Sequence, residues 1–228
     1  MPDFAFAFLD CEFGGLDPEQ HDITEIGAVI TDYRLVELAE REWKVRARPE
    51  RITAEAAQIS GYDAKIWETE AVPLRQALTE LAQLLPKGKT IVPAGQNVRM
   101  DVLFLERAYR DCELNFPFDY HVIDLATLFY VWTLVCGETA QGLSLRQAAT
   151  TAGLVKGQVP HRALGDARLT LETFRHYVGR LAPRPLPDDV PLVTAPLAKP
   201  ENSYIGLDAE ASTPLDEGAA INPGEKRK

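Results

Sequence analysis

The chain contains few cysteines, three in 228 residues. Cys11, Cys112 and Cys136 are odd in number, widely spaced and outside any paired metal-ligand motif, so they predict reduced thiols in a cytosol and no disulfide framework. The N-terminal segment MPDFAFAFLD lacks a basic leader, and Asp10 interrupts it before an apolar run reaches the length of a signal peptide or membrane span. We therefore expect a soluble cytoplasmic protein without membrane attachment.

Basic residues are also scarce, because 24 lysines and arginines face 34 aspartates and glutamates and the net charge is -10. A protein that wraps long duplex presents a broad basic face, since counterion release from phosphates supplies much of its affinity. This composition argues against such a role. An acidic protein that acts on nucleic acid is expected to hold a short end of it.

Aromatic residues nearly disappear from the C-terminal part of the chain. Residues 181–228 contain one aromatic, Tyr204, and eight of the 16 prolines, and so offer little surface for a packed core. The length suits one domain plus an appendage. We predict a single domain over residues 1–180 and a Pro-rich, disordered tail over 181–228.

The hydrophobic periodicity predicts strands first and then alternating strands and helices. Thr53 and Asp124 are the expected N-caps of two helices, and Gly61 stands just past the end of one. The expected strands are 4–12, 23–31, 35–46, 90–94 and 121–123, and the expected helices are 53–59, 71–85, 98–111, 125–135, 143–152 and 163–180. The first three strands form an antiparallel meander, and the later units add parallel strands. This order predicts an α/β fold, a mixed sheet flanked by helices.

Four carboxylates and a histidine stand at the edges of apolar segments. Asp10 and Glu12 alternate on one strand and project from the same face, about 7 Å apart. Asp101 opens a helix, and His161 precedes Asp166 by five residues at the start of another. Carboxylates are seldom buried unless they are paired or bound to a cation. The set therefore predicts a shared metal site.

Each member of this set has a plainer explanation when it is taken alone. Asp10 and Glu12 can face solvent at a strand end, and Asp101 can be a solvated helical charge. A lone histidine such as His161 is more often a surface or capping residue than a catalyst. The hypothesis depends on the set as a whole.

Three segments resemble the motifs of the DEDDh (DnaQ-like) 3′-to-5′ exonuclease family, which includes bacterial proofreading subunits, ribonuclease T and oligoribonuclease. The first motif, Asp, any residue, Glu and then a Gly-Leu step, is matched by LDCEFGGL, residues 9–16. The second places an Asn four residues before an Asp, matched by Asn97 and Asp101. The third, His, four residues and Asp, is matched by His161 and Asp166. The resemblance covers about residues 4–178 and implies a ribonuclease H-like fold.

The resemblance implies two Mg²⁺ or Mn²⁺ ions held by Asp10, Glu12, Asp101 and Asp166, since hard oxygen ligands suit these ions. Two such ions about 4 Å apart activate a water and stabilise the leaving 3′-oxygen. His161 is implied as the general base, for which an unperturbed pKa of about 6.5 is well matched.

The resemblance also suggests substrate contacts. These are Phe13, Gly14, Gly15, Leu16 and Asn97. Leu16 is similar to a wedge between the last two bases, although an apolar residue after a Gly pair is as often a core anchor. Many relatives carry Thr directly after the glutamate, where this chain has Phe13, which either stacks on a base or fills the core. Gln96 stands where relatives often have His, so that role is not carried over.

The leading hypothesis is an exonuclease that releases nucleoside 5′-monophosphates from the 3′ ends of single-stranded DNA or RNA. Two alternatives remain within nucleic-acid metabolism. One is oligoribonuclease-type hydrolysis of RNA of two to five nucleotides, and the other is a polymerase-associated proofreading or accessory module whose tail docks a protein partner. A catalytically dead ribonuclease H-like binding domain is the weakest hypothesis, because it has no need of all five groups.

Overall fold

The computed structural model describes residues 3–155 and 162–181. Three antiparallel strands open the fold, as predicted: β1 (Phe4–Phe13), β2 (Ile23–Asp32) and β3 (Glu37–Lys44). β2 is almost wholly buried, whereas β3 is mostly exposed and buries Trp43. The meander therefore ends in an edge strand whose polar face meets water.

Two parallel strands complete the sheet. β4 (Thr90–Gly95) pairs with β1, and β5 (Ile123–Asp124) pairs with β4, which gives the order β3-β2-β1-β4-β5. This arrangement confirms the predicted mixed sheet. β1 lies in its centre, so the residues at its C-terminal end can be approached by helices from both faces.

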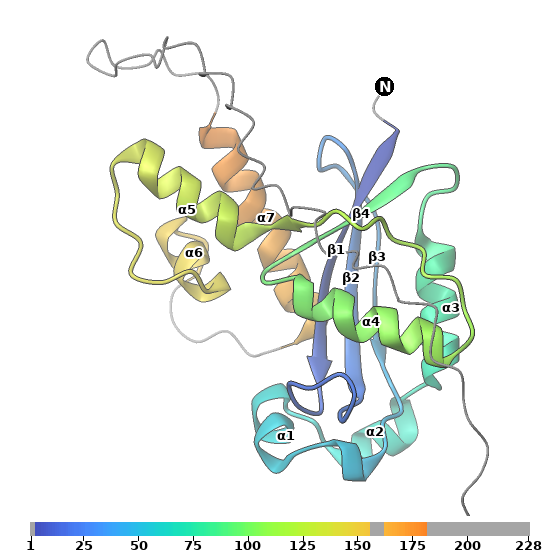
Figure 1. Ribbon diagram of the computed structural model, residues 1–228. Coiled ribbons are helices and arrows are strands. Elements are labelled where there is room, and N and C mark those ends of the chain that lie inside the picture. Colours follow the sequence, from blue (N-terminus) through green and yellow to red (C-terminus); the bar gives the residue numbers. More distant parts are fainter. Residues whose placement is uncertain (1–2, 156–161, 182–228) are drawn as a thin grey trace, which may run out of the picture. The chain divides into compact units, whose positions relative to one another are not determined.

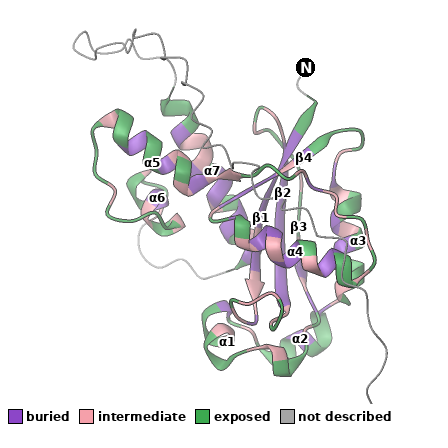
Figure 2. Ribbon diagram, viewed as in Figure 1, coloured by how far each residue is buried: buried purple, intermediate pink, exposed green. Residues whose placement is uncertain are grey.

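Alternation along β1 divides the core into two layers (Figures 1 and 2). Ala5, Ala7 and Leu9 face the layer covered by α3 (Leu74–Leu84) and α4 (Arg99–Asp111). Phe6 and Phe8 face the other layer, where they pack in one cluster with the buried Leu171 of α7 (Ala163–Arg180). The structure thus has helices on both faces of the sheet, and α7 starts on the face to which Asp10 and Glu12 also belong.

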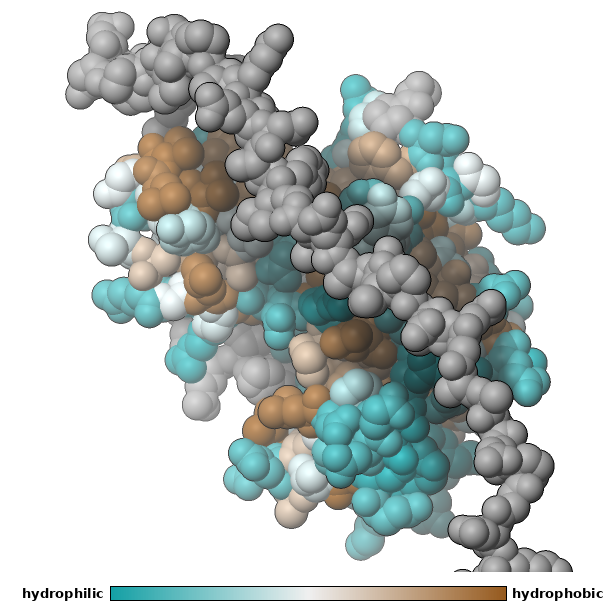
Figure 3. Space-filling model, in the orientation of Figure 1, coloured by the Kyte–Doolittle hydropathy of each residue, from teal (hydrophilic) through white to brown (hydrophobic). Residues whose placement is uncertain are grey.

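Two further helices pack on α7. α5 (Leu125–Cys136) and α6 (Leu145–Thr151) form a small core around Tyr177, whose hydroxyl donates to the Ala148 carbonyl at 2.6 Å. α5 also carries exposed apolar side chains, and Figure 3 shows hydrophobic surface gathered over this helix; they are Tyr130, Val131, Leu134 and Val135.

Three helix ends, two of α1 (Ala54–Ser60) and one of α5, follow the predicted capping residues. Thr53 Oγ accepts from the Ala56 N–H at the start of α1, and Gly61 ends that helix in the left-handed region with φ 68°. Asp124 caps α5 in the same way. α7 has the predicted bounds. The caps set these boundaries because they satisfy N–H and C=O groups that the helix itself leaves free.

One α-helix was not predicted, and another starts later than predicted. α2 (Ala64–Glu70) begins at the cap Asp63 and buries Trp67, whose indole N–H donates to the Thr24 carbonyl at 2.8 Å. The helix predicted from residue 71 begins only at Leu74, because Val72 instead forms a parallel bridge with Val45. A short 3-10 helix, Pro49–Arg51, was also not predicted.

Smaller differences concern the bounds of three elements, β3, β5 and α6. β3 begins at Glu37 rather than 35, because Leu35 takes a left-handed conformation with φ 65° and its N–H donates to the Asp32 carbonyl. β5 occupies residues 123–124 instead of 121–123. α6 begins at Leu145, after the cap Ser144.

Within residues 3–155 and 162–181, no helix is long and apolar enough to cross a membrane. Of the predicted tail, residues 182–228 lie outside the described part of the chain.

Candidate active site

The site is built first on the end of β1. Asp10 and Glu12 project from the same face of this strand, while Cys11 between them is buried in the opposite layer. Asp10 pairs across the sheet with Gly27, and Glu12 pairs with Glu25. The alternation expected of a strand therefore holds to its last residues, and it sets two carboxylates side by side.

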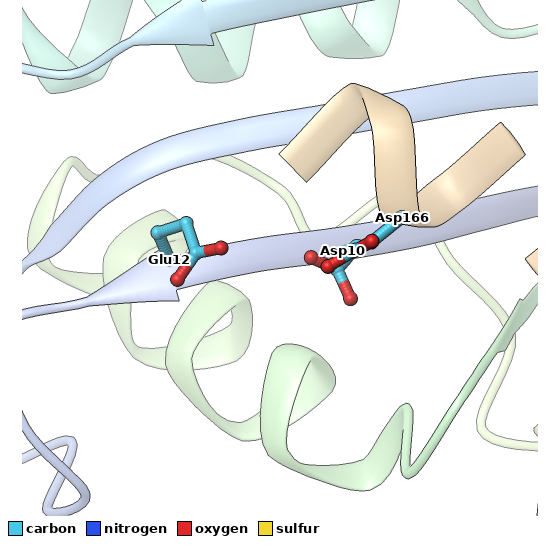
Figure 4. A group of neighbouring side chains, drawn as sticks. All are labelled: Asp10, Glu12 and Asp166. Atoms are coloured by element: carbon cyan, nitrogen blue, oxygen red, sulfur yellow. The ribbon is translucent and has the colours of Figure 1, made fainter. Parts of the chain in front are cut away.

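The first turn of α7 brings a third carboxylate to this pair. Figure 4 shows Asp166 reaching from α7 toward Asp10, with Glu12 farther along the same strand. One oxygen from each of Asp10, Glu12 and Asp166 lies within 4.8 Å of the others. Asp10 and Glu12 are half-buried, and Asp166 is buried. Three converging carboxylate oxygens suit a hard divalent cation.

Asp101 approaches the same strand from the other side. It is buried in the first turn of α4, and its Oδ1 accepts from the Cys11 N–H at 2.8 Å. Asp101 does not belong to the tight group of three, but its charge raises the pKa of Asp10 more than that of any other neighbouring acid. The four predicted acids thus lie at the end of β1. Three of them form a close group, and Asp101 contacts the strand through the backbone N–H of Cys11.

The acids are costly to ionise in the absence of a cation. Burial and then repulsion from Asp101, Asp166 and Glu12 hold the pKa of Asp10 well above its usual value. Burial, with repulsion from Asp166, raises the pKa of Glu12 to about 7, and burial raises the pKa of Asp101 to about 8. Carboxylates brought this close hold protons unless positive charge replaces them. This donor set therefore fits a bound divalent metal.

The raised pKa values predict that the metal-free protein loses stability as the pH rises from about 5 to 8. In the unfolded chain these acids ionise near pH 4, whereas the folded protein keeps their protons up to about pH 7 for Glu12 and pH 8 for Asp101. Unfolding then releases protons, so the free energy of unfolding falls with pH across this window. We expect the Tm measured in EDTA to decrease from pH 5 to pH 8.

Manganese should reverse this trend, because metal binds the ionised carboxylates and favours the folded state more as the pH rises. The gain in Tm on adding Mn²⁺ is therefore expected to be larger at pH 8 than at pH 6. The Asp10→Asn variant should show a flatter Tm profile in EDTA. A wild-type Tm that is constant or rises over this range in EDTA would contradict the raised pKa values of these acids.

His161 lies outside the described residues, which resume at Arg162. Its role as general base therefore stays a prediction. Asp166, five residues later in the same motif, is the member of that motif that the structure places at the carboxylate group.

A cavity of about 410 Å³ lies beside Glu12. Leu16 contributes to its wall and is 83% exposed, so it is not a core anchor. Ala56 and Ile59 of α1, with its cap Thr53, also line the cavity, and Ile59 is an exposed apolar residue. Sequence reasoning missed this α1 wall. The available signal was an isoleucine on the exposed side of a short helix that directly precedes Gly61.

The three other residues of the first motif have separate environments. The ring of Phe13 stacks on Phe104 of α4, with centroids 4.0 Å apart, and it also lines the cavity. The position of a Cβ at Gly14 is taken by the Arg51 carbonyl, 2.2 Å away, and at Gly15 it is taken by the His21 ring. The space that a side chain would take at Gly14 and Gly15 is therefore filled by other residues of the protein.

Asn97 precedes α4 and is exposed, whereas Asp101 one turn later is buried. It takes a left-handed conformation with φ 54°, which asparagine tolerates better than most residues. Its neighbour Gln96 donates from Nε2 to the Leu143 carbonyl at 2.7 Å. Asn97 thus lies on the surface one helical turn before Asp101, and its contact with substrate remains a prediction.

Comparisons with known proteins agree with this geometry. An exonuclease family model, RNase_T, matches residues 7–174. The oligoribonuclease of Pseudomonas putida strain F1 is 29% identical over 180 residues, which cover 75% of this chain and 92% of that protein. The oligoribonuclease of Halorhodospira halophila is 30% identical over 186 residues, which cover 75% and 90%.

Solved structures of Escherichia coli exonuclease I share the fold. A zinc-bound complex with single-stranded DNA has a TM-score of 0.65 at 16% identity, and a complex with a dT13 oligonucleotide has a TM-score of 0.66 at 16% identity. The matches cover 80% and 78% of this chain, which spans 42% of the length of each exonuclease I chain.

Proposed function

The chain belongs to the RNase T family of exonucleases, and from this premise we propose that it removes nucleoside 5′-monophosphates from the 3′ ends of short single-stranded RNA or DNA. The observation that carries the proposal is the meeting of Asp10, Glu12 and Asp166, with Asp101 behind them, at the end of β1. Carboxylates at this spacing repel one another, which costs stability in the metal-free protein. The divalent cation that they attract is what phosphodiester hydrolysis requires.

Exonucleases of this family depend on divalent metal ions, and the carboxylate cluster provides for one. We propose that the ions are two Mg²⁺ or Mn²⁺, held by Asp10, Glu12, Asp101 and Asp166. When bound, such ions offset the charge of the phosphate and stabilise the attacking and leaving oxygens. The fourth acid, Asp101, accepts the Cys11 N–H through Oδ1, which holds its carboxylate beside the end of β1.

We propose His161 as the general base that takes a proton from the attacking water. An imidazole with an unperturbed pKa of about 6.5 accepts protons efficiently near neutral pH.

Two features support a short substrate. The net charge of -10 opposes tracking along a long polyanion, and the cavity beside Glu12 has walls of apolar side chains from the β1–β2 loop and α1, namely Leu16 and Ile59. Relatives that align over most of their length are oligoribonucleases. Apolar surface next to the proposed reaction centre suits the faces of one or two terminal bases.

The product ladder from end-labelled RNA and DNA, two and twenty nucleotides long, tests the proposal in Mg²⁺, in Mn²⁺ and in EDTA. We expect mononucleotide steps from the 3′ end, loss of activity in EDTA, and faster turnover of the dinucleotide. Internal cuts or activity in EDTA would overturn the nuclease mechanism. Faster turnover of the 20-mer would contradict only the proposed preference for short substrates.

Replacement of Leu16 by alanine should weaken the binding of short oligonucleotides. Burial of a leucine side chain against a base contributes about 1.5–3 kcal/mol, so we expect the KM on a dinucleotide to rise about 10-fold or more. The Tm should stay unchanged, because Leu16 is 83% exposed. Leu38→Ala on β3, where the leucine is 54% exposed, is the matched control. Equal KM values for both variants would remove Leu16 from the substrate site.

We propose that residues 1–180 form the catalytic domain and that residues 181–228 are not needed for hydrolysis. A chain ending at 181 should keep the wild-type rate on dinucleotides. If the tail docks a protein partner, its removal will change the binding of that partner and leave this rate intact.

A further inference from the structure

Four carboxylates occupy two neighbouring rows on the α7 face of the sheet, and two of them are not explained by the metal site. Asp10, Gly27 and Glu42 are paired in one row across β1, β2 and β3, and Glu12, Glu25 and Lys44 are paired in the next. Directly paired residues of neighbouring strands project from the same face. Glu25 and Glu42 therefore stand on the same surface as the metal ligands, one strand and two strands away.

The first turn of α7 rests directly on this surface at Gly27. A Cβ at Gly27 would lie 2.2 Å from the Ala163 carbonyl carbon and 2.3 Å from the Leu164 nitrogen. Strand and helix thus meet backbone to backbone, which only glycine permits at this position. Because Gly27 is the sheet partner of Asp10, the helix begins beside the strand position that carries the first acid.

Glu25 and Glu42 both accept hydrogen bonds from the start of the helix beside this contact. Glu25 is fully buried, and its Oε1 accepts from the Ala163 N–H at 3.2 Å while its Oε2 lies 3.3 Å from Arg162 Nη1. Glu42 Oε1 accepts from the Leu164 N–H at 3.3 Å. The first N–H groups of a helix have no partner within it and attract negative charge.

α7 has no cap from its own preceding side chain, since Arg162 makes no capping bond. The sheet therefore supplies what a local Ser, Thr or Asp provides at α1, α2, α5 and α6. Arg162 links this cap to the site, because its carbonyl accepts the Asp166 N–H at 2.8 Å. The chain of contacts runs from Glu25 through Arg162 to the backbone of Asp166.

We infer that Glu25 and Glu42 are positioning residues that fix the first turn of α7 on Gly27, and thereby hold Asp166 at the distance from Asp10 and Glu12 that metal binding requires. The inference deepens the proposed function and rests on it. Removal of a group that orients a metal ligand commonly lowers metal affinity or activity about 10- to 100-fold.

The test measures Mn²⁺ affinity in the full-length protein without substrate, from the electron paramagnetic resonance signal of free Mn²⁺, and kcat and KM on a dinucleotide. Glu25→Ala and Glu42→Ala should weaken Mn²⁺ binding about 10-fold or more and lower kcat, with little change in KM. Glu25→Gln, which keeps an acceptor for the Ala163 N–H, should bind Mn²⁺ within about 3-fold of wild type.

Glu37→Ala is the matched control. Glu37 is a β3 carboxylate that also pairs with α7, 2.8 Å from Arg175 Nη1, but this contact lies far along the helix from Asp166. Its removal deletes the same kind of strand-to-helix ion pair and should leave Mn²⁺ affinity unchanged. A fall in affinity equal to that of Glu42→Ala would mean that any loosening of α7 suffices, and it would overturn the specific role.

The other outcomes are equally decisive. Equal loss of affinity in Glu25→Ala and Glu25→Gln would show that charge near the metal matters rather than the hydrogen bond, and wild-type affinity in the alanine variants would overturn the inference outright. If Glu25→Ala does not fold, the comparison of Glu42→Ala with Glu42→Gln decides in the same way. Failure of the wild-type protein to bind Mn²⁺ would instead refute the proposed function.

Discussion

Alanine in place of Asp10 is expected to abolish exonuclease activity. Asp10 lies in the group with Glu12 and Asp166, and its pKa responds to Asp101, Asp166, Glu12 and Glu25 together. Removal of one preorganised electrostatic group costs about 10²–10³ in rate, and Asp10 is the acid whose pKa is raised by all three other proposed ligands. We expect kcat on a dinucleotide in Mg²⁺ to fall by more than about 10³-fold.

The same substitution should not destabilise the metal-free protein. Asp10 is held among like charges, so its removal relieves repulsion, and the Tm measured in EDTA at pH 8 should stay constant or rise. Asp3→Ala, which removes an exposed aspartate near the start of β1 that pairs with Lys89 at 3.2 Å, is the control and should keep full activity. Substantial metal-dependent turnover by Asp10→Ala would refute the assignment of ligands.

The second large effect is expected from His161→Ala. A positioned general base contributes about 10²- to 10⁴-fold, so kcat should fall by that factor. Mn²⁺ affinity should remain that of wild type, because the four acids are intact. The pH dependence of kcat/KM should also lose its acidic limb near pH 6.5, since the group that must be deprotonated there is gone.

His176→Ala is the control, since His176 lies in the last turns of α7, ten residues beyond Asp166, and is half-buried. It should leave kcat/KM and its pH profile unchanged. If His161→Ala retains wild-type turnover, or keeps the acidic limb, another group accepts the proton and His161 has no part in the mechanism.

Local signals in the sequence account for much of the fold. The meander follows from alternation and length, and Thr53, Gly61 and Asp124 set helix ends because each satisfies backbone groups within a few residues. α2 was missed although Asp63 caps it, because its seven residues carry too short a pattern and Trp67 gains its place only through contact with the distant Thr24 carbonyl.

The site was predictable to the extent that its residues fall in recognisable motifs. Asp10 and Glu12 converge because a strand alternates, but the approach of Asp166 depends on how α7 lies across the sheet. Glu25 and Gly27 lie in the predicted second strand, but their role could not be predicted, since their partners stand some 136–138 positions away. The cavity wall on α1 was missed for the same reason, because it exists only after that helix packs beside the β1–β2 loop.

The Cys11 amide at the end of β1 allows the position of Asp101 to be followed by hydrogen exchange, without a measurement of activity. Pairing with β4 stops at Phe8, and three residues later the Cys11 N–H donates to the Asp101 carboxylate instead of to a neighbouring strand. The deuterium exchange rate of the Cys11 amide therefore reports whether the Asp101 carboxylate remains hydrogen-bonded to it. If substrate or metal draws Asp101 away from the strand, the Cys11 amide will exchange faster while the amides around it become more protected.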